Sequence, residues 1–214
     1  GGESWLELDD WNKRKEGHEA FIEYLQDKPR LFLLGGGHVG LAFADVIRSL
    51  DFHLIVMDER PEFANKDRFP SAHEVVVGNF EESLAAYPER NNDWFVIMTP
   101  GHKKDKECAF AALQRKSAYV GMIGSKTKVA RTRKDLLEAG ISQERLDEFY
   151  SPIGLNLGGQ TPAEITISIA AEIVQIRNQT KISAIEDPIL EAIHELDNEP
   201  VMMVTIIKKT GSGP

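Results

Sequence analysis

Short apolar runs alternate with amphipathic stretches along most of the chain. Runs of three to five mostly apolar residues predict strands at 31–34, 53–57, 75–77, 94–98 and 119–123. Apolar residues that recur every three or four positions predict helices at about 38–50, 80–87, 104–116, 127–139, 142–148 and from 162 onward. The strand at 94–98 is wholly apolar, as is typical of a strand that is buried on both faces.

This alternation predicts an α/β fold, a Rossmann-like doubly wound and mostly parallel sheet with helices on both faces. We expect an N-terminal segment 1–28, a Rossmann-like domain 29–180 and a short C-terminal helix–strand appendage 181–214. The spacing also predicts a helix at 18–26, and the appendage contains a predicted helix at 188–196 and a predicted strand at 201–207. Because one helix and one strand cannot bury a core alone, the appendage must join the main sheet, pair with a second chain or belong to a domain that is cut short.

The stretch Gly35-Gly36-Gly37-His38-Val39-Gly40 follows the first predicted strand and fits the G-x-G-x-x-G pattern of dinucleotide-binding turns. We expect Gly35 to allow a sharp turn, Gly37 to let a phosphate lie against the backbone, and Gly40 to let the helix pack on the strand. The N–H groups at the helix start would attract the anion. His38 is either a donor to a phosphate or substrate oxygen, or an exposed residue that the turn tolerates. The alternative for the whole motif is a glycine turn of another doubly wound sheet, without the ligand.

The second predicted strand ends at Asp58, the position at which a Rossmann protein reads the ribose hydroxyls of its nucleotide. Arg60 follows two residues later and could pair with a phosphate. In the alternative interpretation, this loop is solvated and Arg60 bridges Asp58. If a nicotinamide nucleotide binds, Asp58 favours NAD over NADP, because a 2′-phosphate would meet a carboxylate.

Polar side chains also follow the most apolar predicted strand, 94–98. Thr99, His102 and Asp105 occur where short polar residues have few packing reasons to be present. We expect His102 and Asp105 to form an oriented acid–base pair with a catalytic role, and Thr99 to contribute to ligand binding. Asp105 could instead cap the start of the following helix.

A further turn, Gly124-Ser125-Lys126, lies between the strand at 119–123 and a helix. Lys126 and Lys128 begin a run of basic residues that no acidic residue interrupts before Asp135. We expect Gly124, Ser125, Lys126 and Lys128 to contribute to a site for an anionic ligand. The basic residues from Arg131 onward are more typical of a solvated helix face.

Composition and charge exclude several classes of protein. The formal net charge of −9 argues against a general nucleic-acid-binding protein. No apolar run approaches the ~20 residues that a membrane-spanning helix requires. The single cysteine, Cys108, excludes an internal disulfide, fits a reducing cytoplasm and is more typical of a buried core thiol than of a nucleophile. The sequence contains neither a C-x-x-C nor an H-E-x-x-H pattern, so we expect no metal site.

Several segments together resemble one family, the XdhC/CoxI accessory proteins of molybdenum hydroxylases such as xanthine dehydrogenase. They cover roughly residues 31–178, in order. The matching segments are Gly35–Gly40, Asp58–Asn65 with Arg68–Pro70, Thr99–His102, Tyr119–Lys126, and Gly154–Gly159 with Thr161–Ile165. Such a series is far more specific than the glycine motif alone. Residues 188–214 resemble the opening of a CoxI-like domain.

The resemblance implies a Rossmann domain in a protein that binds molybdenum cofactor (molybdopterin). It implies partners as well: a sulfurtransferase that helps to sulfurate the cofactor, a hydroxylase apoenzyme that receives it, and a second copy of the chain in a homodimer. Such a chaperone need have no turnover of its own. Two alternatives remain open from the residues: an NAD(P)-dependent oxidoreductase, and a regulatory module that senses a nucleotide and uses 181–214 for dimer contact.

Overall fold

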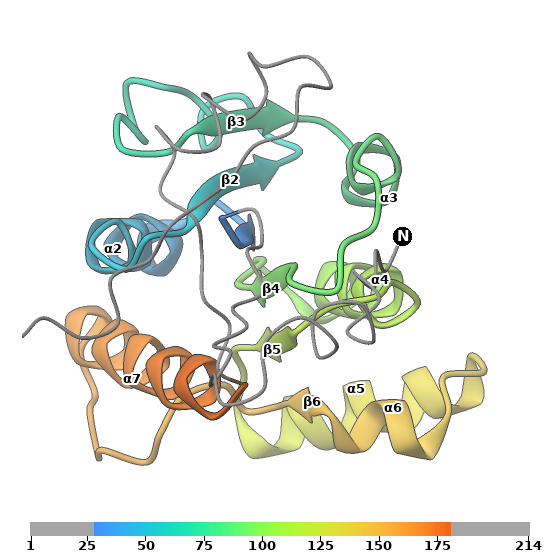
Figure 1. The fold of residues 1–214 in the computed structure, drawn as a ribbon. Coiled ribbons are helices and arrows are strands. Elements are labelled where there is room, and N and C mark those ends of the chain that lie inside the picture. Colours follow the sequence, from blue (N-terminus) through green and yellow to red (C-terminus); the bar gives the residue numbers. More distant parts are fainter. Residues whose placement is uncertain (1–27, 181–214) are drawn as a thin grey trace, which may run out of the picture.

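The computed structural model describes residues 28–180 (Figure 1). The strands are β1 (Arg30–Leu34), β2 (His53–Asp58), β3 (Glu74–Val77), β4 (Trp94–Ile97), β5 (Tyr119–Met122) and β6 (Phe149–Tyr150). The helices are α2 (His38–Ile47), α3 (Phe80–Ala85), α4 (His102–Leu113), α5 (Lys126–Glu138), α6 (Gln143–Asp147) and α7 (Pro162–Thr180). The predicted helices at 18–26 and 188–196 and the predicted strand at 201–207 lie outside the described residues.

The strands form one parallel sheet in the order β3-β2-β1-β4-β5-β6. Phe32 of β1 lies opposite Ile55 of β2 on one side and Phe95 of β4 on the other. The chain therefore winds outward from β1 in one direction as far as β3, and then returns to add β4, β5 and β6 in the other. This confirms the predicted doubly wound α/β fold, and it places the topological switch point between the carboxyl ends of β1 and β4.

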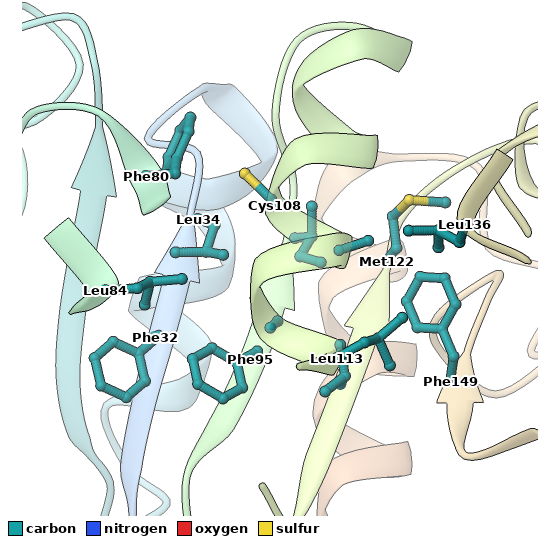
Figure 2. Close-up of a cluster of buried hydrophobic side chains, with 14 of the residues drawn as sticks. Phe32, Leu34, Phe80, Leu84, Phe95, Cys108, Leu113, Met122, Leu136 and Phe149 are labelled. Atoms are coloured by element: carbon teal, nitrogen blue, oxygen red, sulfur yellow. The ribbon is translucent and has the colours of Figure 1, made fainter. Parts of the chain in front are cut away.

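Helices cover both faces of the sheet (Figure 1). Alternate residues of each strand point to opposite faces, so Phe32 and Leu34 join one buried cluster while Leu31 and Leu33 join the other. The first cluster packs under α3, α4, α5 and α6, and Figure 2 shows how its side chains fill the space between these helices and the sheet. The second cluster packs under α2 and α7, which lie side by side. Burial on both faces explains why the central strands are apolar throughout.

Local chemistry sets several helix boundaries. Glu164 of α7 accepts hydrogen bonds from the backbone N–H groups of Gln160 and Thr161, both at 2.9 Å, and the Thr161 hydroxyl accepts from the N–H of Glu164. Thr161 and Glu164 therefore form a capping box at the start of α7. Gly140 directly follows the last turn of α5 with φ +99°, a conformation that glycine adopts without strain.

Two elements differ from the prediction. The helix expected at about 104–116 begins at His102, because Gly101 takes φ +116° directly before it and lets the chain turn straight from the strand into the helix. The sequence also shows no period for β6, which has only two residues and pairs with β5 through Phe149 and Tyr150. A two-residue strand is too short to show an alternation, and it is anchored by the buried Phe149 side chain and by the Tyr150 ring, which stacks on Tyr119.

Candidate functional site

The glycine turn joins β1 to α2 at the switch point, and three of its glycines are required by the fold. A Cβ atom on Gly35 would lie 2.4 Å from the carbonyl oxygen of Met98, and the residue has φ +116°. A Cβ on Gly36 would lie 2.1 Å from the carbonyl oxygen of Phe63, and one on Gly40 would lie 2.3 Å from that of Gly35. These backbone contacts let the turn, the neighbouring loop and the helix approach one another closely.

Gly37 is different, because a Cβ atom there would have no neighbour within 4 Å. It occupies the N-cap position of α2 with an ordinary φ of −65° and ψ of −170°, and no side chain caps the helix. The first N–H groups of a helix have no partner within the helix and attract anions. The space beside Gly37 is therefore open, and the binding of a phosphate there stays a prediction. His38, the first residue of α2, is exposed.

Asp58, at the end of β2, is bound to its neighbours through both carboxylate oxygens. Oδ1 accepts hydrogen bonds from the backbone N–H of Arg60 at 3.1 Å and from its Nε at 2.8 Å. Oδ2 accepts from the N–H of Gly36 at 2.9 Å and from Nη2 of Arg60 at 2.9 Å. Burial by itself would raise the pKa of Asp58, but these hydrogen bonds outweigh it and hold the pKa below its usual value. The structure thus contains the Arg60–Asp58 bridge of the alternative interpretation, but Asp58 itself is buried and not solvated.

A second arginine lies against the same turn. Arg68 donates from Nε to the carbonyl oxygen of Gly36 at 3.1 Å. Its Nη2 atom is buried and has no hydrogen-bond partner among residues 28–180. Both guanidinium groups lie over the ring of Phe63, with Arg60 at 3.8 Å and Arg68 at 5.4 Å from the ring centre. The sequence pattern does not assign Arg68 to the site, although the Arg-Phe-Pro segment at 68–70 is part of the family resemblance. We call Gly35–Gly37, Asp58, Arg60 and Arg68 the β1–β2 side of the switch point.

On the other side, Thr99 and Asp105 meet Lys128 in one buried network. The Thr99 hydroxyl donates to Oδ1 of Asp105 at 2.5 Å, and Lys128 forms an ion pair with Oδ2 of the same carboxylate. Asp105 is fully buried, while about a quarter of the Lys128 side chain is exposed. Lys128 therefore neutralises a buried carboxylate and ties α5 to the first turn of α4.

His102 and Asp105 do not form the predicted acid–base pair. His102 lies on the first turn of α4, and its ring instead contacts α5, with Nε2 3.1 Å from Oδ2 of Asp135 and Nδ1 3.2 Å from the hydroxyl of Thr132. Both residues are therefore engaged with α5, through different partners. The prediction is wrong because it depends on nearness in sequence, whereas the α5 partners lie about thirty positions further along the chain. We call Thr99, His102, Asp105 and Lys128 the β4–β5 side of the switch point.

The turn after β5 has a structural role at the start of α5. Ser125 is the N-cap of α5, and its hydroxyl accepts a hydrogen bond from the N–H of Lys128 at 3.3 Å. Gly124 packs against the side chain of Lys128, and Lys126 is exposed. Ser125 and Lys128 thus have structural roles in α5, and the contributions of Gly124, Ser125, Lys126 and Lys128 to a ligand stay predictions.

An ion pair between Lys104 and Glu59 joins the two sides of the switch point. Lys104 of α4 donates to Glu59 at 2.7 Å, and Glu59 follows Asp58 directly. The hydrogen bonds from Lys104 to Glu59 and Glu107 raise the pKa of the Lys104 ammonium group. Nothing in the sequence signals this contact, because the two residues are far apart in the chain and each resembles an ordinary surface charge.

Cys108 is completely buried in the cluster under α4, as Figure 2 shows, and burial raises the pKa of its thiol strongly. Such a thiol is inert, as the sequence predicts. Within residues 28–180, no group of three or more histidine, cysteine or acidic side chains could hold a metal ion. No helix in that range is long and apolar enough to cross a membrane.

The strand order, the glycine turn and the acidic residue at the end of β2 define a Rossmann-domain protein. Residues 31–173 match the XdhC Rossmann domain, and the chain belongs to that family. This confirms the resemblance on which the sequence-based hypothesis depends.

Three proteins are similar to this chain in sequence or in structure. It is 30% identical over 178 residues to the uncharacterized protein YqeB of Escherichia coli, covering 83% of this chain and 32% of that protein. It is 30% identical over 162 residues to a Bacillus subtilis protein named as a probable xanthine dehydrogenase subunit, covering 76% of this chain and 47% of that protein. A crystal structure described as a xanthine dehydrogenase from Bacillus halodurans superposes with a TM-score of 0.62 at 32% identity, over 72% of this chain and 44% of the other. The chain thus spans less than half the length of these relatives.

Proposed function

We propose that this chain is an accessory protein of molybdenum hydroxylases of the xanthine dehydrogenase type, and that its switch point binds the molybdenum cofactor. The membership of the XdhC family and the names of two relatives support the first part. The open space beside Gly37, in the turn that Arg68 contacts at the carbonyl oxygen of Gly36, supports the second. In this proposal the chain holds the cofactor and delivers it, without chemical turnover of its own.

The residues at the β1–β2 side fit the phosphate end of such a cofactor. Molybdopterin is a pterin that carries a dithiolene for the metal and ends in a phosphate. The N–H groups at the start of α2 would hold that phosphate where Gly37 leaves room, and Arg68 has a buried Nη2 with no acceptor among the described residues. When bound, the cofactor supplies the molybdenum centre that the hydroxylase uses.

Sulfuration of the cofactor requires a sulfur carrier, and Cys108 does not fit that task. It is the one cysteine of the chain, it is fully buried, and burial raises its thiol pKa. The sulfur in this proposal therefore comes from a partner sulfurtransferase, while this chain only holds the acceptor. The hydroxylase apoenzyme is the recipient, a homodimer is the proposed assembly, and the cytoplasm is the proposed place of action.

A nucleotide ligand is the second candidate, because the Rossmann architecture favours it. NAD or NADP could serve there as a regulatory signal or as a hydride carrier. The dehydrogenase form of this alternative has less support, because His102, the candidate acid, is engaged by Thr132 and Asp135 of α5.

Native mass spectrometry of the full chain tests the proposal. The chain is offered anaerobically released molybdenum cofactor together with NAD, NADH, NADP and CTP. We expect it to retain a molybdopterin mass, and we expect Gly37→Val to abolish retention by filling the phosphate space. Asp45→Val, an exposed change on the same helix, is the control. Retention of a nicotinamide nucleotide alone, or of nothing, would contradict the cofactor-binding proposal.

A further inference from the structure

Arg60 alters what the β1–β2 side can recognise. In a Rossmann site that reads a ribose, the carboxylate at the end of the second strand accepts hydrogen bonds from the two ribose hydroxyls. Here both oxygens of Asp58 already accept two hydrogen bonds each, from Gly36 and Arg60. A carboxylate offers about four acceptor positions. Asp58 therefore has no acceptor left for a diol unless Arg60 moves away.

The same contacts turn Arg60 into a fixed donor. Its Nε and one N–H of Nη2 bind Asp58, so about three of the five guanidinium N–H groups remain. Its side chain is 36% exposed, and the guanidinium carbon lies 3.8 Å from the centre of the Phe63 ring. A guanidinium held in this way loses little conformational freedom when it binds an oxyanion. The hydrogen bond from its side chain to Asp58 also raises the pKa of Arg60, so the group stays charged at every physiological pH.

We propose that Arg60 makes the β1–β2 side a site for a phosphate monoester, so that the ligand carries a phosphate where NAD has a free ribose diol. This inference rests on the proposed ligand site at the switch point. It reverses the preference for NAD over NADP that Asp58 alone suggests. A guanidinium has donors only, and a phosphate monoester brings three acceptor oxygens, whereas a diol needs the acceptors that Asp58 no longer offers.

Neighbouring carboxylates limit how strongly this site can bind a phosphate. Glu59 is paired with Lys104, but its charge also contributes to the raised pKa of Arg60. Glu62 is exposed and contributes to the raised pKa of Arg60, so it competes with a phosphate for the same charge. Recognition therefore depends on the directed N–H donors of Arg60 rather than on an excess of positive charge. Removing the charge of Glu62 should strengthen phosphate binding.

Titration calorimetry with two probes that differ by one phosphate tests whether Arg60 gives the site a preference for a phosphate monoester. The full chain is titrated with 2′-phospho-ADP-ribose and with ADP-ribose. We expect the phosphorylated probe to bind at least about tenfold tighter. In Arg60→Ala the preference should disappear or reverse, because Asp58 becomes free to accept from the diol. Glu62→Gln should increase the preference. Arg48→Ala removes an exposed arginine at the far end of α2 and should leave the ratio unchanged.

A pterin pair distinguishes the two sources of a phosphate monoester. A pterin that carries the phosphate is compared with the same pterin after phosphatase treatment. Because molybdopterin carries a single phosphate, an Arg60-dependent preference for the phosphorylated pterin would identify the cofactor's own phosphate as the ligand group and place it at Arg60 rather than beside Gly37. A preference within the nucleotide pair alone identifies a nucleotide. Thermal unfolding confirms that each variant is folded. If Arg60→Ala is not folded, Arg60→Lys retains the charge without the fork geometry and should also lose most of the preference.

The results separate this inference from the proposed function. Binding that Gly37→Val abolishes, but with equal affinity for both members of each pair or a preference for the diol, would overturn the role of Arg60 and leave the ligand site standing. If no probe binds and no molybdopterin is retained, both proposals are wrong.

Discussion

The two sides of the switch point use their charged groups in opposite ways. On the β4–β5 side, Asp105 and Lys128 neutralise each other within the protein, and His102 binds Asp135 of the neighbouring helix. On the β1–β2 side, Arg60 binds Asp58 and Arg68 binds the carbonyl oxygen of Gly36 through only part of each guanidinium group. Each arginine retains N–H groups without a partner among the described residues. The first arrangement holds two helices together, and the second presents donors. Charged residues at a strand end therefore indicate a ligand only where their hydrogen-bonding capacity is not used up.

The largest expected effect comes from the β4–β5 side. Lys128→Ala would leave Asp105 buried without its cation, and removing one partner of a buried ion pair costs about 3–5 kcal/mol. We therefore expect urea unfolding to show a loss of about 3 kcal/mol in the free energy of unfolding. Lys126→Ala, on the same helix and exposed, should change it by less than about 0.5 kcal/mol. If the two variants were equally stable, the ion pair would not be structural.

Substitutions in the glycine turn should have a smaller effect on stability, and that effect should differ between Gly36 and Gly37. Gly36→Ala places a Cβ atom against the carbonyl oxygen of Phe63, and such overpacking costs about 1–3 kcal/mol. Gly37→Ala meets no atom, so its cost should not exceed the ~1 kcal/mol of losing a good N-cap residue. Thermal unfolding measures the stability, and titration with 2′-phospho-ADP-ribose measures binding. Gly37→Ala should reduce the free energy of binding 2′-phospho-ADP-ribose by more than it reduces the free energy of unfolding. A Gly37 variant that is markedly less stable than the Gly36 variant would contradict this division.

The smallest effect concerns the pH dependence of stability on the β1–β2 side. The pKa of Asp58 is lower in the folded chain than its usual value of 3.8, so the folded state binds fewer protons at this group than the unfolded state does. Its stabilisation is fully present above about pH 5 and is lost as the pH falls below about 4. Asp58→Asn should reduce this part of the acid sensitivity, measured by urea unfolding at pH 7 and pH 3.5. Glu81→Gln, at an exposed carboxylate, should retain the wild-type acid sensitivity.

Much of the fold could be predicted because the relevant signals are local. Five of the six described strands and the helices of the sheet follow from apolar runs and helical spacing. The roles of Gly35 and Gly40 in the turn follow from their places in the glycine pattern, and the structure confirms both through close backbone contacts. The strand β6 could not be predicted, because its two residues show no period and its pairing with β5 depends on the whole sheet.

The candidate site could be predicted less completely. The sequence locates Asp58, Arg60, Asp105 and Lys128 at the correct edge of the sheet. It does not determine that Lys128 binds Asp105, or that His102 turns away toward Asp135. Arg68 escapes prediction, because a partly buried arginine in a polar loop resembles an ordinary surface residue until the loop folds back on Gly36.

The sequence by itself determined the parallel α/β architecture, the glycine turn and the family of this chain. These depend on neighbouring residues: on the period of apolar side chains and on positions where only glycine fits. Only the tertiary structure decided which charged groups neutralise each other and which retain free donors. Asp105 meets Lys128 from the next helix, and Arg68 meets Gly36 from a loop about thirty residues away. Such pairs depend on the distances between elements, because the attraction of two charges falls with their separation in space and is independent of their separation along the chain.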